Sequence, residues 1–330
     1  MSRYAKAHAH PQGPGDDRPT AIQVIQDEDM LDRLKSKIIV ITGTSSGIGV
    51  ETARALSLTG ATLFLTARDV PKARKALEGT LDLKRTEFIE MDQASLSSVR
   101  AAAGEILSKT DNINILINNA GVMAVQELQL TSDAHELQFG TNHLSHFLFF
   151  NLLKPALLKA ILPSFHSRVV IVTSSSHVKA SINSSDNYDF RLGGYDPWVA
   201  YAQSKTANVY MANELERRHG AQGLHGISVH PGAALTCIGK HVPEGEIKAI
   251  TSDEELKKIW KNAEQGAAVT VVAAVSREWE GRGGRYLVDC VEADTPADET
   301  NIFSSGYARH TYKPEDEGRL WADSLALVGL

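Results

Sequence analysis

Two side chains able to move a proton, Tyr201 and Lys205, stand four residues apart in a stretch that the sequence predicts to be helical. Residues four apart share one face of a helix, so the phenol and the ammonium would be neighbours. A phenol titrates near about pH 10, and a nearby cation that stabilises the phenolate lowers this pKa toward neutrality. The pair therefore predicts a general acid or base. The competing interpretation is an amphipathic helix whose lysine extends toward solvent.

A glycine-rich turn at residues 42–49 follows a β-branched run at Ile38–Thr42, opens a helical pattern at 48–58 and is followed by a second run at 62–66. This order is one βαβ unit. Glycines let the chain turn sharply, and the N–H groups at a helix start can hold a pyrophosphate. The turn predicts a dinucleotide site that includes Gly43, Ser45, Ser46, Gly47, Ile48 and Gly49.

Residues after the next strands predict which dinucleotide is bound. Arg68 follows the second run, where an NAD site usually carries an acid, and a guanidinium there favours the 2′-phosphate of NADP(H) over NAD(H). Asp69 would take the acidic role if the strand ended one residue later. Asp92, with Gln93 beside it, could accept from the adenine amino group. Asn119, Ala120 and Gly121 follow the fourth run and are either cofactor contacts or a plain turn.

Seven apolar runs are expected to form the strands of the fold. After the runs at 38–42 and 62–66, five more follow at 87–91, 113–117, 168–173, 227–230 and 285–289, with helical patterns between most of them. Strands that alternate with helices form a parallel sheet through right-handed crossovers. The sequence predicts an α/β, Rossmann-type doubly wound fold with a seven-stranded parallel sheet flanked by helices on both faces. Ligands bind such sheets at the carboxyl ends of the strands.

The domain organisation is expected to be simple. Residues 1–34, rich in proline and glycine, are expected to be a flexible arm without a signal peptide, and residues 35–330 a single domain. The irregular stretches 178–198 and 233–262 are expected on the substrate side, the second as a lid. Residues 295–330 form a C-terminal extension whose end should pack back on the body.

Composition excludes several classes of protein. The chain has 330 residues, a net charge of -6 and 42% hydrophobic residues, which is typical of a globular protein and argues against nucleic acid as a partner. No uncharged apolar run reaches about 18 residues, so no transmembrane segment is expected. The two cysteines, Cys237 and Cys290, lack metal-ligand spacing and predict no metal site, no disulfide framework and a reducing, cytoplasmic location for a soluble protein.

Taken in this order, the motifs resemble the classical short-chain dehydrogenase/reductase family over about residues 35–289. The matching positions, besides the turn at 42–49 and residues 118–121, are Asn142, Ser174, Tyr201, Lys205, Pro231 and Gly232. Residues 139–144, 201–208, 230–236 and 320–321 resemble its retinol-dehydrogenase-like branch. The resemblance implies an NAD(P)-binding Rossmann-type catalytic domain.

The resemblance also implies roles for these residues in hydride transfer between NADP(H) and a carbonyl or alcohol group. Tyr201 would be the general acid or base, Lys205 would stabilise its phenolate and bind the nicotinamide ribose, and Ser174 would hydrogen-bond the substrate oxygen. Asn142 would hold a water that links Lys205 to solvent. Ser175 is the alternative to Ser174, although strand alternation and the family register favour Ser174. Further cofactor contacts are expected from Pro231, Gly232, Ala234 and Thr236.

The substrate is expected to be a lipophilic ketone or alcohol, such as a retinoid, a steroid or a polyketide-like secondary metabolite. Ser174 and Tyr201 are 27 positions apart (201 minus 174), and the loop between them carries Tyr188, Phe190, Tyr195 and Trp198. These aromatic residues either wall the pocket or form a surface cluster of their own. Residues 144–153 and the Tyr201 helix resemble the dimer surface of the family, so a homodimer is possible. The rival function is an NADP(H)-binding sensor or scaffold without turnover.

Overall fold

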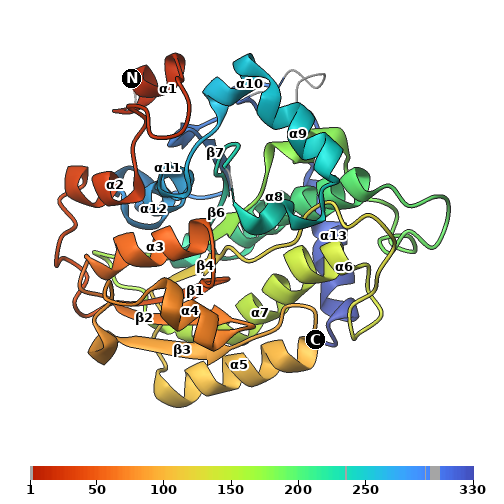
Figure 1. Cartoon of the computed structure of the whole chain (residues 1–330). Coiled ribbons are helices and arrows are strands. Elements are labelled where there is room, and N and C mark those ends of the chain that lie inside the picture. Colours follow the sequence, from red (N-terminus) through yellow and green to blue (C-terminus); the bar gives the residue numbers. More distant parts are fainter. Residues whose placement is uncertain (1–2, 235, 294, 298–304) are drawn as a thin grey trace.

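An open sheet of eight strands runs through the computed structural model, which describes residues 3–234, 236–293, 295–297 and 305–330 (Figure 1). The strands are β1 (Ile38–Thr42), β2 (Thr62–Ala67), β3 (Thr86–Glu90), β4 (Ile115–Asn118), β5 (Ser167–Val172), β6 (Leu224–His230), β7 (Arg285–Val288) and β8 (Val291–Glu292). Their order is β3-β2-β1-β4-β5-β6-β7-β8. The predicted Rossmann-type fold is thereby confirmed.

The predicted count of seven strands is wrong by one, because β8 pairs with β7 in the antiparallel direction. Asp289 and Cys290 join the two strands and both have positive φ angles, 51° and 63°. This backbone conformation is the one that lets a two-residue turn reverse a strand. A strand of two residues has no hydrophobic alternation by which the sequence could reveal it.

The helices alternate with the strands along most of the chain. They are α1 (Ala5–Ala9), α2 (Ala21–Asp27), α3 (Ile48–Ser57), α4 (Val70–Ala76), α5 (Leu96–Lys109), α6 (Leu137–Phe139), α7 (Ser145–Lys159), α8 (Pro197–His219), α9 (Glu244–Ser252), α10 (Glu254–Ile259), α11 (Ala263–Gly266), α12 (Ala268–Val275) and α13 (Pro314–Leu327). A π-helical turn, η2 (Gly140–Leu144), leads into α7. The short 3₁₀ turns are η1 (Leu83–Arg85), η3 (Ser175–Lys179), η4 (Gly220–Gln222), η5 (Cys237–His241) and η6 (Arg277–Trp279).

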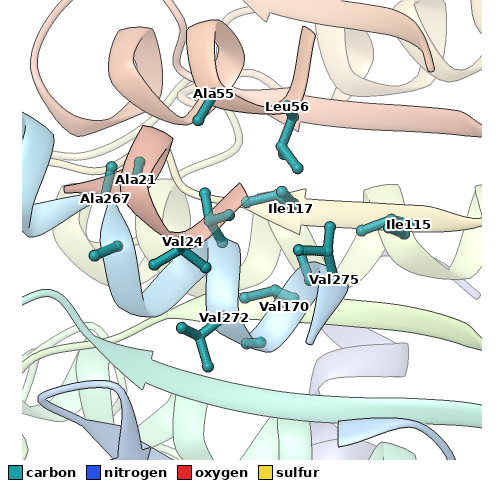
Figure 2. Close-up of a cluster of buried hydrophobic side chains, with 14 of the residues drawn as sticks. Ala21, Val24, Ala55, Leu56, Ile115, Ile117, Val170, Ala267, Val272 and Val275 are labelled. Carbon is teal, nitrogen blue, oxygen red and sulfur yellow. The ribbon is translucent and has the colours of Figure 1, made fainter. Parts of the chain in front are cut away.

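Both faces of the sheet are buried, and alternate residues of β1 separate the two cores. Ile39 and Ile41 pack with α2, α3 and α12, whereas Val40 faces the core formed with α5 and α7. Figure 2 shows the first core, in which Val24 of α2 and Val272 of α12 belong to the same cluster as Ile117 of β4 and Val170 of β5. Burial on both faces is why the strands read as continuous apolar runs.

The N-terminal segment differs from the expected flexible arm. Thr20 caps α2 by accepting a hydrogen bond from the Gln23 N–H at 3.2 Å, and Ala21, Val24 and Ile25 are buried against α12. This spacing of three and four residues gives α2 one apolar face, and burying a side chain of this size contributes about 1.5–3 kcal/mol. The prediction of a free arm is therefore wrong for the described residues of 1–34; residues 1–2 lie outside them.

The C-terminal helix α13 packs back on the body, as predicted. Trp321 meets the ring of Phe147 edge-on, with a centroid distance of 4.9 Å, and also contacts Phe150 of α7. Phe147 and Phe150 are fully buried within the single chain. A homodimer that used these side chains would require α13 to move away. Residues 298–304 of the predicted extension lie outside the described part.

After β6, residues 236–260 form a segment that we call the lid, which contains η5, α9 and α10 (Figure 1). No residue of α9 or α10 is buried. Residue 235, within the predicted loop 233–262, is not among the described residues. The other predicted loop, 178–198, connects η3 to α8, which Asp196 caps by accepting the N–H groups of Trp198 and Val199, each at 2.8 Å.

The two edges of the sheet carry charged side chains. On β3, Glu87 and Glu90 are exposed, and Glu87 pairs with Lys109 of α5 at 2.9 Å. At the other edge, Glu292 of β8 pairs with Arg282 at 3.2 Å and with Arg285 at 3.4 Å.

Candidate active site

A cleft of about 740 Å³ opens at the carboxyl ends of the parallel strands, where the loops after β1 to β6 meet the lid. The sequence prediction named cofactor and catalytic residues in eight separate stretches of chain. All of these residues line the cleft except Asn142. This is the edge at which a doubly wound sheet binds its ligand, because helix starts and loop amides converge there.

The glycine-rich turn is held by close backbone contacts. Gly43 has a φ angle of 73°, and its N–H donates to the Thr66 carbonyl at 2.9 Å. A methyl group on Gly49 would collide with the Gly43 carbonyl oxygen, so only glycine fits there. Gly47 precedes α3 and offers no side-chain oxygen to the first N–H groups of the helix. Those N–H groups are the donors that bind a pyrophosphate at a helix start.

A buried histidine that sequence reasoning missed, His146, joins the two halves of the site. The Thr42 hydroxyl oxygen accepts the N–H groups of Asn119 at 2.9 Å and Ala120 at 3.0 Å, so its own hydrogen points to His146 Nε2 at 2.9 Å. His146 Nδ1–H then donates to the Asn142 carbonyl at 3.0 Å. Burial lowers the pKa of His146 to about 4, so the ring is neutral. Its only sequence signal is a polar residue inside an apolar helix.

Asn142 lies on the π-helical turn behind Gly121, outside the lining of the cleft. Its Oδ1 accepts the Val122 N–H at 2.8 Å, while its Nδ2 donates to the Val122 carbonyl and to Ser204 Oγ, both at 2.9 Å. The side chain therefore fixes the loop after β4. π-helical turns of this kind recur at functional sites. The proposed link through water to Lys205 stays a prediction.

Tyr201 and Lys205 lie one turn apart on α8, and both are almost fully buried. Lys205 Nζ is 5.6 Å from the centroid of the Tyr201 ring and donates to the Val172 carbonyl at 3.2 Å. Burial lowers the pKa of Lys205 to about 8 and raises the pKa of Tyr201 to about 12, against a hydrogen bond with Ser174. The predicted downward shift of the Tyr201 pKa is thus wrong for the protein alone, because desolvation of the phenolate is the largest influence on this pKa and raises it.

The Ser174 hydroxyl lowers the pKa of Tyr201, which favours Ser174 over Ser175 as the serine that meets the substrate oxygen. Ser174 follows β5, and its Oγ accepts the N–H of Ser176 at 3.1 Å. His177 holds the same loop: the Ala308 N–H donates to its Nε2 at 3.2 Å, so its Nδ1–H donates to the Ser174 carbonyl at 2.8 Å. His177 thus orders the serine loop.

The end of β2 favours Arg68 over Asp69 as the residue that meets the ribose. The strand ends at Ala67, so Arg68 is the first residue beyond it. Asp69 caps α4 instead, because its Oδ1 accepts the Lys72 N–H at 2.9 Å. Lys72 also lines the cleft and is exposed. Two cations, Arg68 and Lys72, therefore line the cleft just after β2.

After β3, Asp92 Oδ1 accepts the Ala94 N–H at 3.0 Å. The neighbouring Gln93 Nε2 is buried at the cleft and has no hydrogen-bond partner among the described residues. An unpaired buried amide costs about 1–3 kcal/mol, so this group is suited to a ligand acceptor.

Many side chains of the cleft lining are apolar, among them Val122, Met123, Leu137, Trp198, Ile238, Val242, Ile247, Ile250 and Trp260. Of the four aromatic residues predicted for the loop before α8, Trp198 alone lines the cleft. Tyr188 stacks on Phe139 with a centroid distance of 5.0 Å, and Phe190 meets Tyr195 edge-on. Tyr188 and Tyr195 thus contact α6, through Phe139 and through Gln138, instead of lining the cleft.

Two other features bear on what the chain can bind. Within the described ranges, no helix combines the length and apolar character needed to cross a membrane. The same ranges hold no group of three or more histidine, cysteine or carboxylate side chains arranged for a metal ion.

Comparison with known proteins identifies relatives of the whole chain. A family model described as short chain dehydrogenase matches residues 37–247. The short-chain dehydrogenase/reductase prx1 of Penicillium roqueforti is 44% identical over 99% of this chain and 95% of its own length, and human retinol dehydrogenase 13 is 34% identical over 90% and 86%. Among solved structures, an uncharacterized protein from Mycobacterium paratuberculosis has a TM-score of 0.67 at 32% identity, covering 89% of this chain and 93% of that one.

Proposed function

The chain belongs to the short-chain dehydrogenase/reductase family, in its retinol-dehydrogenase-like branch, and is an oxidoreductase; from this premise we propose that it transfers hydride between NADP(H) and a lipophilic ketone or alcohol. One observation carries the proposal: the Tyr201 hydroxyl, its partner Ser174 and the Lys205 ammonium share one cleft with the glycine-rich turn. The tight turn at Gly49 and the unpaired Gln93 amide fit a dinucleotide.

In this proposal a bound nicotinamide supplies the hydride, and the chain supplies the proton. In the reductive direction Tyr201 gives its proton to the carbonyl oxygen, while Ser174 donates a hydrogen bond to the same oxygen. Lys205 stabilises the phenolate that remains. Because its pKa of about 8 leaves most of the lysine charged at neutral pH, this cation is present when it is needed.

The function is tested by offering the protein NADPH, NADP⁺ and a panel of lipophilic ketones and alcohols while nicotinamide absorbance is followed. We expect turnover with at least one apolar ketone, because many side chains of the cleft lining are apolar. Tight NADPH binding without turnover across the panel would instead support the sensor or scaffold. The presence of Tyr201, Lys205 and Ser174 at one point of the cleft favours the enzyme.

Cofactor preference is part of the proposal and rests on Arg68 with Lys72. Arg68→Ala is expected to weaken NADPH binding about 10- to 100-fold and NADH binding less than about twofold, because a guanidinium–phosphate bond contributes about 1.5–3 kcal/mol. Lys75→Ala, an exposed cation of α4 outside the cleft, is the matched control. Dissociation constants from titration calorimetry decide the matter, and equal losses for both cofactors would remove Arg68 from 2′-phosphate recognition.

A cytoplasmic location completes the proposal. Its support is that both cysteines are unpaired, Cys237 exposed and Cys290 buried.

A further inference from the structure

An arginine near the N-terminus, Arg18, is buried beside the end of the lid, with only 5% of its surface exposed. Its Nη1 donates to the Ile259 carbonyl at 2.9 Å, and its Nη2 donates to the carbonyls of Lys258 at 3.3 Å and Trp260 at 2.5 Å. These contacts span 240 to 242 positions of sequence. Figure 1 shows the N-terminal segment and α10 at the same end of the molecule.

The three carbonyls belong to the C-terminal end of α10, where helix geometry leaves carbonyl oxygens without intrahelical partners. A cation at this end also interacts favourably with the helix dipole. The helix ends at Ile259 and the backbone turns to an extended conformation at Trp260. The guanidinium, with five donors in a fixed plane, therefore caps α10 in place of a residue from the helix itself.

Arg18 is itself held rigidly. Its Nε donates to Asp16 Oδ1 at 2.8 Å, and its Nη2 also donates to the Gly13 carbonyl at 3.1 Å. Gln265 of α11 donates to the same Asp16 oxygen at 2.9 Å and accepts the Gly15 N–H at 3.0 Å. Although burial opposes it, the pKa of Asp16 is lowered by the Arg18 hydrogen bond and by backbone N–H groups, so the pair stays charged. Residues 13–18 thus form a fixed clamp.

The lid has little else to hold its α10 end. No side chain of α9 or α10 is buried, so hydrophobic packing contributes little there. The next anchor along the chain is Lys261, whose N–H donates to the Ala233 carbonyl at 2.8 Å and whose Nζ pairs with Asp289 at 2.8 Å. Between these anchors stands Trp260, which lines the cleft.

We propose that Arg18 is a positioning residue of the active site, which fixes the α10 end of the lid and thereby the Trp260 wall of the cleft. The N-terminal segment is then a working part of the substrate site. The positional claim stands on the contacts above, and its effect on turnover rests on the proposed function.

The test is limited trypsin digestion of the full chain, because Lys248, Lys257 and Lys258 are exposed on the lid helices. Arg18→Ala should speed cleavage after these lysines about tenfold or more, since three carbonyls and the partly buried Asp16 lose their contacts with the guanidinium. Cleavage at sites outside the lid should stay within about twofold of the wild-type rate, which a global loss of stability would not allow. Arg33→Ala, which removes an exposed ion pair with Asp29, is the control.

Arg18→Lys keeps the charge but loses the planar fork, so it should fold normally and give an intermediate cleavage rate. With a ketone substrate from the panel, Arg18→Ala should raise KM about tenfold and change kcat less than about threefold. Cleavage of Arg18→Ala at the rate of Arg33→Ala would overturn the proposal. Faster lid cleavage in a protein that turns over no ketone would leave the clamp standing and defeat only the enzymatic function.

Discussion

Replacing Tyr201 with phenylalanine is expected to lower kcat by about 10³–10⁴-fold while the dissociation constant for NADPH changes less than about twofold. In the proposed reaction the phenol is the general acid, and removing a general acid of this kind costs about two to four orders of magnitude in rate. The substitution also removes the interaction of the Tyr201 hydroxyl with Ser174, which lowers kcat further by a smaller factor. The aromatic ring remains, so the packing of α8 is preserved.

Single-turnover kinetics with preformed NADPH complex measure this effect, because they separate chemistry from product release. Tyr312→Phe is a matched control, since Tyr312 is partly exposed, lies outside the cleft and also loses one hydroxyl. If Tyr201→Phe retained more than about one tenth of the wild-type rate, the tyrosine would not be the proton donor.

Acid is expected to unfold the protein steeply below about pH 6.5. Burial lowers the pKa of four histidines: His143 and His230 to about 3, and His146 and His177 to about 4. Unfolding restores a histidine pKa near 6.5, so below this pH the unfolded chain binds protons at these histidines and the folded chain does not. Their stabilising contribution is therefore complete above about pH 6.5 and is lost as the pH falls toward the folded values.

Glu136 works in the opposite direction, because burial raises its pKa to about 7 and the folded state keeps a proton that the unfolded state releases. On unfolding between pH 5 and 6, the four histidines take up four protons and Glu136 releases one, so the chain takes up about three protons in total. Each proton changes the free energy of unfolding by about 1.4 kcal/mol per pH unit, so about 4 kcal/mol is lost per unit. A typical free energy of unfolding of about 5–15 kcal/mol would therefore fall to zero within a few pH units.

Urea unfolding at several pH values from 5 to 7.5 gives the slope directly. His143→Gln, which keeps a side-chain amide near Ser324, should reduce the uptake by about one proton. A free energy of unfolding that stayed level across this range would mean that the buried histidines are accessible to protons.

The sequence predicted the parts of the fold and site that rest on local pattern. The runs that became β1 and β2 are almost continuously apolar, the glycine turn has one backbone solution, and Tyr201 and Lys205 share a helix face by spacing alone. These features depend on neighbours within a few residues, which is the range over which pattern carries information.

What escaped prediction depends on partners far along the chain. In the sequence Arg18 is only a charged residue in a proline-rich tail, whereas in the structure it donates to three carbonyls of α10. In the same way, His146 only interrupts an apolar run in the sequence, but in the structure it contacts the Thr42 hydroxyl. The Tyr201 pKa was misjudged because spacing reveals the lysine but not the burial that removes water from the phenolate. Burial is a property of the assembled fold.

The charged edges of the sheet bear on how the protein behaves at high concentration. An open sheet exposes unpaired backbone groups at both ends, each a template on which a strand from another molecule can add. Here β8 is only two residues long and carries Glu292 between two arginines, while β3 presents Glu87 and Glu90. A strand approaching either side would have to desolvate these charges, so the chain is protected against edge-to-edge aggregation without closing its sheet into a barrel.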